Sequence, residues 1–343
     1  MRLVVVTQRV DPSDPNLGAT AAKLRALAER VDELVVLADA AVEGALPGNA
    51  RVRLFRAPSR AGRGVRFERA LAAELARRPR PAAVLAHMCP IYAVLAAPLA
   101  RPLGVRVLLW FTHWRPSRLL RLAERLSSAV LSVERGSFPL ASAKLVPIGH
   151  GIDLREFPCA ARPPRDPATP IRLLALGRTS PAKGLDTVLR AVALVPEATL
   201  AVHGPSLTAE ERAHRAALER LVAELGLAER ATLGPPLPRE QVAALFAGAD
   251  ALVNNMRAGA PDKVVYEAAA ACVPVLASNP VFAGFLPDEL RFPREDAAAL
   301  AERIRALPVL DAGAVGRRLR ERVRREHSVE HWAAAVVEQA SRP

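Results

Sequence analysis

Stretches with the apolar pattern of a buried strand alternate with stretches of helical period along almost the whole chain. In the first half, the strand-like runs are Leu3–Thr7, Glu33–Leu37, Val52–Phe55, Ala83–Ala86, Val105–Phe111, Ala129–Val133 and Lys144–Pro147. The helical patterns between them include Ala19–Arg30, Val65–Arg77, Ile91–Leu103 and Ser117–Leu126. Strands that alternate with helices in this way are typical of a doubly wound parallel sheet.

A proline-rich segment, Pro158–Pro170, interrupts this alternation and is typical of a linker. The alternation restarts with strand-like runs at Ile171–Leu176, Thr199–His203, Ala231–Leu233, Ala251–Val253 and Val273–Ala277. A chain of 343 residues is long enough for two such α/β cores. We therefore predict two facing Rossmann-like domains, at residues 1–160 and 161–326, and a C-terminal helix at 327–343 that packs back on the first domain.

The net charge of +13 comes mainly from arginine, and ten arginines fall between Arg51 and Arg80 against two glutamates. One interpretation is a surface that meets anionic lipid, nucleic acid or a phosphorylated acceptor. The other is an arginine-rich composition expressed on solvated helix faces, and the sequence leaves both open. Nucleic acid is the weakest partner, because only 4% of the residues are aromatic and no nucleic-acid-binding motif occurs.

The three cysteines, Cys89, Cys159 and Cys272, are too few and too scattered for a disulfide framework, and their spacing is not that of a metal site. This usage favours a reducing compartment. The first apolar run is too short for a secretory signal, and the longest one, Met88–Ala100, is too short to span a bilayer and contains two prolines. We expect a soluble cytoplasmic protein, with a possible peripheral location at the inner face of the cell membrane.

The segment Gly177–Gly184 has the pattern of a phosphate site. It follows the strand-like run Ile171–Leu176, carries Arg178 and Lys183, and opens a helical pattern. Backbone N–H groups and the positive end of a helix dipole would then point to the same place as the two side-chain cations.

A second segment, Asp262–Glu267, leads into an alanine-rich helical pattern and then into the apolar run Val273–Ala277. A carboxylate in the first turns of such a helix can accept hydrogen bonds from sugar hydroxyls. The two segments together indicate a protein that binds a sugar nucleotide.

The order of these motifs resembles the retaining glycosyltransferases of family four, which include glycogen and sucrose synthases and have two Rossmann-like domains in the GT-B arrangement. The resemblance covers nearly the whole chain. It rests on the Gly177–Gly184 segment, Ala249-Asp250, the helix with Glu267, Pro274-Val275, the Gly149–Asp153 turn followed by Phe157, and Thr112-His113 at a strand end. It implies a transferase that moves a sugar from a nucleotide-sugar donor to a glycan, lipid-linked or small-molecule acceptor.

The resemblance also implies roles for single residues. Arg178 and Lys183 would hold the donor diphosphate and stabilise the leaving group as its negative charge grows. Glu267 would bind the nucleotide ribose. Gly18, Gly177, His203, Gly204, Lys263 and Val264 would lie at the donor as well. For each cation and for Glu267, the simpler interpretation is a solvated or dipole-favoured residue at a helix start.

The sequence departs from the family pattern at Gly259, where many members have a first glutamate near the donor sugar. The turn that follows, Pro261-Asp262-Lys263, would bring Lys263 and a helix N-terminus toward the phosphate or the donor sugar. A non-catalytic relative of the same fold therefore stays an alternative.

Three histidines lie where a cleft is expected. His113 follows a buried strand, and polar groups at the C-terminal edge of a parallel sheet lie where ligands bind. By resemblance it would contact the donor sugar. His87 and His150 would line the acceptor side or the cleft, although each could equally be a core residue.

A Rossmann-type oxidoreductase is disfavoured, because no Gly-x-Gly-x-x-Gly follows either Leu3–Thr7 or Ile171–Leu176. The chain also has no Asp-x-Asp of the metal-dependent glycosyltransferase type, so we expect no metal and no cofactor, with cationic side chains in the place of the metal. The expected partners are the donor, a sugar or lipid-linked acceptor, and an anionic membrane.

Overall fold

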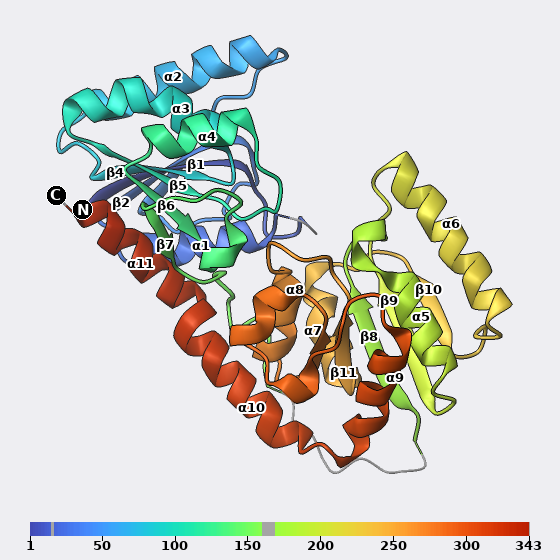
Figure 1. Ribbon diagram of the computed structural model, residues 1–343. Helices are drawn as coiled ribbons and strands as arrows, with labels where there is room; N and C mark the ends of the chain where they lie inside the picture. Colours follow the sequence, from blue (N-terminus) through green and yellow to red (C-terminus); the bar gives the residue numbers. More distant parts are fainter. Residues whose placement is uncertain (15–16, 160–168, 343) are drawn as a thin grey trace. The chain divides into compact units, whose positions relative to one another are not determined.

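The computed structural model describes residues 1–14, 17–159 and 169–342. The chain divides into two compact units, one formed by Met1–Asp153 with Glu326–Pro343 and the other by Leu154–Arg325 (Figure 1). The first unit thus ends a few residues before the predicted boundary at 160, and the C-terminal helix belongs to this unit. Residues 160–168, the centre of the predicted linker, lie outside the described residues.

The first unit contains a seven-stranded parallel sheet in the order β3-β2-β1-β4-β5-β6-β7. The strands are β1 (Arg2–Val10), β2 (Glu33–Ala41), β3 (Ala50–Leu54), β4 (Ala83–His87), β5 (Arg106–Trp110), β6 (Ala129–Ser132) and β7 (Leu145–Pro147). The order reverses between β1 and β4, which is the topological switch point of a doubly wound sheet. The predicted α/β class is confirmed.

Helices cover both faces of this sheet. They are α1 (Ala19–Ala28), α2 (Arg60–Ala76), α3 (Pro90–Ala100), α4 (Arg118–Leu126) and α11 (Val329–Ser341). Figure 1 shows α2, α3 and α4 together over one face and α1 beside α11 over the other. Ser59 and Ser117 cap the N-termini of α2 and α4. Each side chain accepts a hydrogen bond, at 3.0 Å, from the backbone N–H of the third residue of its helix.

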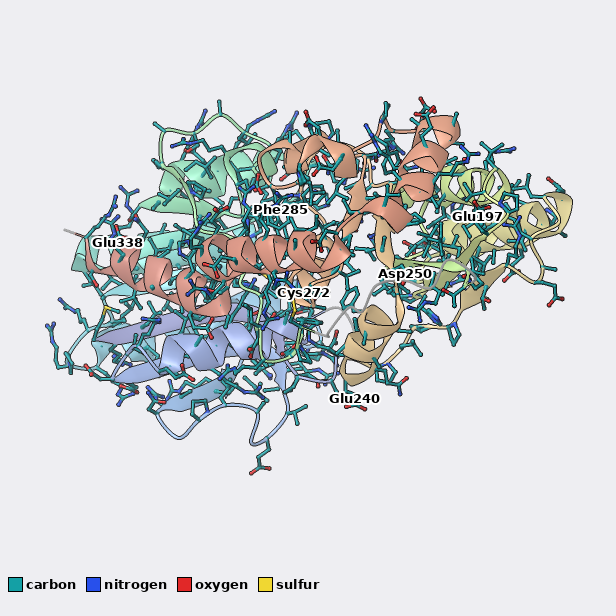
Figure 2. All side chains as sticks on the ribbon, turned by 90° about the horizontal axis from the view of Figure 1, so that it is seen from below. Glu197, Glu240, Asp250, Cys272, Phe285 and Glu338 are labelled. Carbon is teal, nitrogen blue, oxygen red and sulfur yellow. A yellow bond between two sulfur atoms is a disulfide. The ribbon has the colours of Figure 1, made fainter. Side chains whose placement is uncertain are left out.

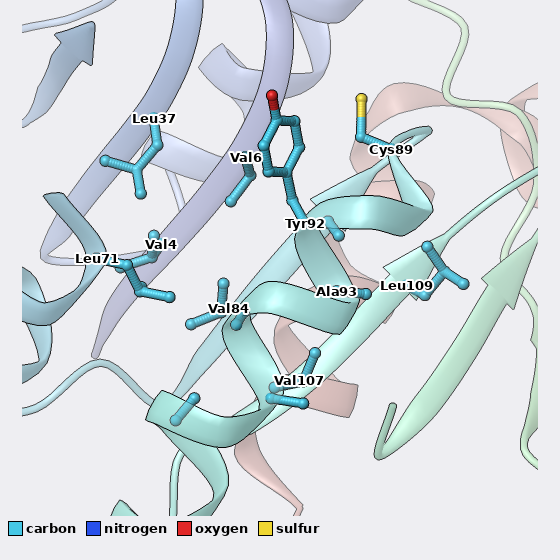
Figure 3. Packing of buried hydrophobic residues seen from close by; sticks show 14 of the residues in the cluster. Val4, Val6, Leu37, Leu71, Val84, Cys89, Tyr92, Ala93, Val107 and Leu109 are labelled. Carbon is cyan, nitrogen blue, oxygen red and sulfur yellow. The ribbon is translucent and has the colours of Figure 1, made fainter. Parts of the chain in front are cut away.

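The core of the first unit lies between the sheet and α2 to α4 (Figure 3). Val4 and Val6 of β1 and Val84 of β4 are fully buried, and they pack with Leu71 of α2 and Tyr92 of α3. Strands that are covered on both faces need apolar side chains on both sides, which explains the unbroken run of valines in β1.

Part of the positive charge between Arg51 and Arg80 is paired with acidic side chains within the fold. The carboxylate of Glu74 is completely buried and pairs with Arg51, with Arg53 at 2.8 Å and with Arg2. A buried carboxylate needs such partners, because an isolated buried charge is very costly. Arg51 and Arg53, at the N-terminal end of this basic run, therefore stabilise the fold by neutralising a buried carboxylate. Contact with an anionic membrane stays a prediction.

The second unit contains a five-stranded parallel sheet in the order β10-β9-β8-β11-β12. Its strands are β8 (Ile171–Leu176), β9 (Ala198–His203), β10 (Ala231–Gly234), β11 (Ala251–Asn254) and β12 (Val275–Ala277). Its helices are α5 (Leu185–Ala193), α6 (Ala209–Glu224), α7 (Arg239–Gly248), α8 (Lys263–Ala270), α9 (Ala297–Ala306) and α10 (Ala312–Arg322). Asp250, labelled in Figure 2, fixes the start of β11 by pairing with Arg172 of β8 at 2.9 Å.

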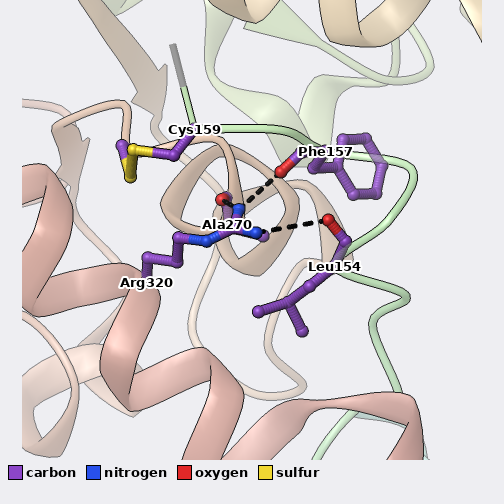
Figure 4. The surroundings of a disulfide bond; sticks show 6 residues. Leu154, Phe157, Cys159, Ala270 and Arg320 are labelled. Carbon is purple, nitrogen blue, oxygen red and sulfur yellow. Dashed lines mark hydrogen bonds between the residues drawn. A yellow bond between two sulfur atoms is a disulfide. The ribbon is translucent and has the colours of Figure 1, made fainter. Parts of the chain in front are cut away.

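The expectation that the cysteines form no disulfide is wrong, because Cys159 and Cys272 are bonded to each other (Figure 4). They are 113 residues apart in the sequence, and the fold places the segment after Leu154 beside the end of α8. Arg320 supports the same place by donating to the carbonyl oxygens of Phe157, at 2.5 Å, and Ala270. The cysteine usage thus gives no support for a reducing compartment.

Among the described residues, no helix combines the length and the apolar character needed to cross a bilayer.

Candidate active site

The second unit gathers its candidate site residues at the C-terminal edge of its sheet. Gly177 follows β8, His203 ends β9, and Asn254 ends β11. All these strands are parallel, so their carboxyl ends meet at one edge. The two segments that the sequence singled out are therefore neighbours in space.

Two glycines bring the ends of β8 and β9 into close contact. The N–H of Gly177 donates to the carbonyl oxygen of His203 at 3.0 Å. A Cβ atom on Gly204 would lie 1.9 Å from the carbonyl oxygen of Gly177, so no side chain fits there. Gly177 itself has a φ of +123°, which glycine adopts readily. Both predicted glycines thus serve close backbone approach.

Lys183 reaches back over this turn. It ends a 3₁₀ turn, Pro181–Lys183, and Gly184 then begins α5 with a φ of +55°. A Cβ atom on Gly177 would lie 2.6 Å from Nζ of Lys183, so the ammonium lies directly against the turn. The structure thus brings Gly177 and Lys183 together, and their role at a donor phosphate stays a prediction.

The ammonium of Lys183 is paired with the carboxylate of Asp262. Asp262 is the residue before α8, and its Oδ2 also accepts a hydrogen bond from Nδ2 of Asn254 at 2.8 Å. The structure therefore holds an anionic group against the lysine that was predicted to bind phosphate. No sequence pattern indicates this ion pair.

Arg178 does not share this anion in the structure. Its guanidinium lies 3.1 Å from Oε1 of Glu211, and its side chain is half-exposed. Glu211 forms a capping box with Thr208 at the start of α6. The predicted pair of cations thus has two different carboxylate partners, Glu211 for Arg178 and Asp262 for Lys183.

Glu267 is buried on α8 between two cations. Its Oε1 lies 3.0 Å from Nζ of Lys263 and 3.0 Å from Nη1 of Arg239. Burial raises the pKa of the Glu267 carboxyl, but the charges of Lys263 and Arg239 outweigh burial, so its pKa lies below the ordinary value. The carboxylate is therefore kept ionised and ready to accept hydrogen bonds.

Arg239 holds a second carboxylate as well. Its Nη2 lies 2.6 Å from Oε2 of Glu156, and its guanidinium lies over the ring of Phe157. Burial lowers the pKa of Arg239, but Glu267 and Glu156 together raise it above the ordinary value. Sequence reasoning missed Arg239. A lone arginine after Pro235–Pro238 gives no sign that it will meet α8.

The other predicted donor residues of this unit are spread along the same edge. Nδ1 of His203 lies 3.2 Å from the carbonyl oxygen of Pro235, and Val264 is buried in the first turn of α8. Gly259 has a φ of +120°, and Nδ2 of Asn279 lies 3.5 Å from its carbonyl oxygen. The loop after β11 is thus held by a hydrogen bond from the Asn279 side chain at the position where the family carries a glutamate.

In the first unit, His87 is a core residue at the end of β4. It is buried and stacks on the ring of Trp110, with 4.8 Å between the ring centroids. Burial, and to a smaller extent the charge of Lys23, lower its pKa well below the ordinary value. The ammonium of Lys23 lies 3.9 Å from the centroid of the same Trp110 ring. His87 is therefore neutral at physiological pH.

The remaining residues predicted in this unit are His113, His150 and Gly18. His113 is exposed, and its Nδ1 accepts a hydrogen bond from the backbone N–H of Arg115 at 3.0 Å. His150 is buried in the turn after β7, between Gly149 and Gly151, which both have positive φ. Gly18 is the residue before α1, as the glycine-loop prediction requires.

A cavity of about 660 Å³ opens at the C-terminal edge of the first sheet, beside the switch point between β1 and β4. Its walls include Arg9 of β1, Asp39 of β2, Arg63 of α2 and Tyr92 of α3. Nη1 of Arg63 lies 3.1 Å from Oδ2 of Asp39. Crevices at this position are where doubly wound sheets bind ligands. Sequence patterns did not reveal these wall residues, because each comes from a different element.

No group of three or more His, Cys, Asp and Glu side chains that could hold a metal ion occurs among the described residues. What the two units provide is a cationic turn with buried carboxylates in one, and a polar cavity in the other.

Comparison with known proteins matches part of the chain to a family model and to two relatives. Residues 161–311 match the family model described as "Glycosyl transferases group 1". The chain is also similar to a D-inositol 3-phosphate glycosyltransferase of Mycolicibacterium gilvum, with 35% identity over 136 residues. A second such enzyme, of Mycobacterium marinum, is 33% identical over 142 residues.

These matches are partial. They cover 37% and 40% of this chain and only 30% of the length of each relative. The substrate of the relatives is therefore a property of those proteins.

Solved structures match over the whole length. Sucrose-phosphate synthase from Thermosynechococcus elongatus is 19% identical, with a TM-score of 0.76 over 98% of both chains. HepE from Anabaena, solved in complex with UDP and glucose, is 15% identical, with a TM-score of 0.76 over the full length of both chains. At such identities the likeness shows the fold alone. The predicted resemblance is confirmed at this level: the chain has the fold of these solved structures, and its residues 161–311 match the glycosyl transferases group 1 family model.

Proposed function

We propose that the protein is a retaining glycosyltransferase that binds a nucleotide-sugar donor on its second unit. The observation that carries this proposal is the position of Lys183. Lys183 lies just before the start of α5, and its ammonium is in contact with Gly177, which follows β8. The same ammonium is paired with the carboxylate of Asp262. A site that binds one anion in this way suits the diphosphate of a donor.

The chemistry asked of this site is leaving-group stabilisation. When the bond between the sugar carbon and the donor phosphate oxygen breaks, the nucleoside diphosphate keeps the electron pair and gains negative charge. Fixed cations stabilise that charge more in the transition state than in the ground state. We assign this role to Lys183 and Arg178, without a metal ion, and we assign contact with the transferring sugar to His113.

The nucleoside would lie along α8 and β9. Glu267 is ionised and buried, and its carboxylate can accept hydrogen bonds from ribose hydroxyls. UDP is the first nucleotide to test, because HepE was solved with UDP and with UDP-glucose.

The acceptor would bind to the first unit. Its cavity beside β1 and β4 combines the charges of Arg9, Arg63 and Asp39 with the ring of Tyr92. Such a wall suits an acceptor that carries hydroxyl groups. A carboxylate accepts a hydrogen bond from a hydroxyl group, and a guanidinium group donates one to a hydroxyl oxygen.

The proposal is tested by measuring nucleoside diphosphate release from a panel of UDP-, GDP- and ADP-sugars, with and without candidate acceptors. UDP, GDP and ADP are titrated in parallel and followed by thermal shift. Binding of one nucleotide together with acceptor-dependent release supports the transferase. No binding of any of the three would contradict it.

A second candidate is a sugar-nucleotide-binding relative without catalysis. Gly259, which stands where many members of the family have a glutamate, favours it. Such a protein would bind a nucleotide with the same residues but release no diphosphate with any acceptor.

A further inference from the structure

Helix α3 lies at the surface of the first unit but carries no charged side chain. One side of it packs on the sheet, with Tyr92, Ala93 and Ala96 in the core. On the other side Ile91 and Pro98 are exposed. A surface helix ordinarily has a polar outer face, and a helix that is apolar all round is normally covered. The outer side of α3 therefore indicates a partner that covers it.

The neighbouring helix α4 extends this apolar surface (Figure 1). Leu119 and Leu122 of α4, one turn apart, are 40% and 44% exposed, and Ile91 of α3 is 41% exposed. Ile91 and Leu119 line one cavity, so the two helices contribute to one surface. Single exposed apolar side chains are common, whereas a group of them on adjoining helices marks an interaction surface. We call Ile91, Pro98, Leu119 and Leu122 the α3–α4 face.

Exposed arginines flank the α3–α4 face on both sides, because α3 packs against α2 as well as α4. They are Arg118, Arg121 and Arg125 of α4 and Arg60, Arg66 and Arg69 of α2. Within the part of the chain that the structure describes, none of these arginines pairs with a carboxylate. Their charge is therefore available to an external anion.

The combination of an apolar face and flanking arginines fits an anionic lipid surface. Basic and leucine-rich helices of this kind lie in the interface plane of bilayers. A second copy of the chain, docked face to face, would bring arginines opposite arginines, which is unfavourable. A nucleic acid would find no ring for base stacking, since α4 has no aromatic residue and Tyr92 of α3 is buried.

We propose that the α3–α4 face docks on the surface of an anionic lipid bilayer. Its aliphatic side chains would enter the boundary between headgroups and acyl chains, and the flanking arginines would pair with lipid phosphates. Because Ile91 and Leu119 also line the cavity beside β1 and β4, a docked bilayer would bring lipid headgroups to the edge of that cavity. Only the consequence that the acceptor is a lipid rests on the proposed function.

The test is co-sedimentation of the full chain with vesicles rich in phosphatidylglycerol, at two salt concentrations, with phosphatidylcholine vesicles as the neutral reference. Wild-type binding to the anionic vesicles should weaken as salt rises. Leu119→Gln combined with Leu122→Gln should lower the affinity at least about tenfold at both salt concentrations, because salt does not screen the burial of apolar surface. Arg118→Gln combined with Arg121→Gln should lower it mainly at the lower salt concentration.

The matched control replaces Leu194 and Val309 by Gln, since they are exposed apolar residues of the second unit. This control should bind like the wild type, and an unchanged thermal midpoint shows that the Leu119 and Leu122 variant is folded. Wild-type affinity in that variant, equal losses in the control, or no binding to anionic vesicles would overturn the proposal. So would a dimer, seen by analytical ultracentrifugation, that the two leucine substitutions dissociate. Vesicle binding requires neither a donor nor turnover, so its failure is distinct from a failure of the proposed transferase.

Discussion

The carboxylate of Asp262 lies against the ammonium of Lys183, in the turn that we propose to hold the donor diphosphate. Asn254 donates to the same carboxylate, so Asp262 is bound on two sides as a phosphate oxygen would be. A donor must therefore share Lys183 with Asp262 or displace it.

This relationship predicts opposite effects of two substitutions. Asp262→Asn should tighten UDP binding about fivefold, because it removes one negative charge, and two unit charges 4 Å apart in a water-like medium interact by about 1 kcal/mol. Lys183→Ala should lower turnover by two or more orders of magnitude, taking about 3 kcal/mol for one preorganised contact. Titration with UDP and steady-state kinetics measure the two effects. Weaker UDP binding in Asp262→Asn would instead make Asp262 part of the site.

Lys263 is the next cation to test. In the structure it pairs with Glu267 at 3.0 Å, from the first turn of α8. If Lys263 also contacts the donor, as the Pro261-Asp262-Lys263 turn predicts, Lys263→Ala should lower kcat/KM clearly. Gly259→Glu should not restore it, because a carboxylate cannot replace a cation at a phosphate. A change of less than about twofold in Lys263→Ala would leave Lys263 as a solvated residue at a helix start.

Arg239 should set the acid limit of donor binding through Glu267. The pKa of the Glu267 carboxyl is raised by burial and lowered more strongly by Lys263 and Arg239. In Arg239→Gln one of these charges is lost while burial stays, so the pKa of Glu267 should rise. If UDP binding needs the ionised carboxylate of Glu267, the variant should lose UDP affinity at a higher pH than the wild type as the pH is lowered. The pH dependence of UDP affinity measures this.

The control for this experiment is Arg324→Gln, since Arg324 belongs to the same unit, is exposed and pairs with Glu321. A merely structural role of Arg239 would lower affinity equally at every pH. An acid limb that does not move would therefore contradict the positioning role.

The parts of the site that the sequence predicted are local. Gly177, Lys183 and the start of α5 lie within eight residues of the chain, so strand pattern and turn residues suffice to place them together. The contacts that it missed join distant segments. Lys183 meets Asp262, Arg239 meets Glu267, and Cys159 meets Cys272, and in each pair the fold brings together two segments that are separated in the sequence.

The periodicity of apolar residues along the chain does not show which distant segments will meet. The path of the loop before α8 depends on a positive φ at Gly259 and on hydrogen bonds from Asn279, neither of which appears in a hydrophobic pattern. Alternation of strands and helices, in contrast, fixes the class of fold, because it states which faces must be buried.

The disulfide between Cys159 and Cys272 should stabilise the second unit measurably. A cross-link that closes a loop of more than one hundred residues typically contributes about 2–4 kcal/mol. Cys159→Ser should therefore unfold at lower denaturant concentration than the wild type, and a reductant should shift the wild type to the same midpoint. Cys89→Ala, which leaves the disulfide intact, is the control for losing a cysteine. An unaltered wild-type midpoint in reductant would show that the bond contributes nothing to stability.

The basic run Arg51–Arg80 gives a last prediction, on anionic membranes. Arg51 and Arg53 are engaged by Glu74, whereas Arg60 and Arg69 of α2 are exposed. We expect co-sedimentation with vesicles rich in anionic lipid, falling steeply as salt rises, because a basic residue near such a surface contributes about 1 kcal/mol and is screened within a Debye length. Replacing Arg60 and Arg69 together by Gln should reduce binding by at least about tenfold on the same basis. Replacing Arg318 and Arg324 of the second unit should not. Equal binding to neutral vesicles, or no binding to anionic ones at low salt, would leave an arginine-rich composition as the better explanation of the charge.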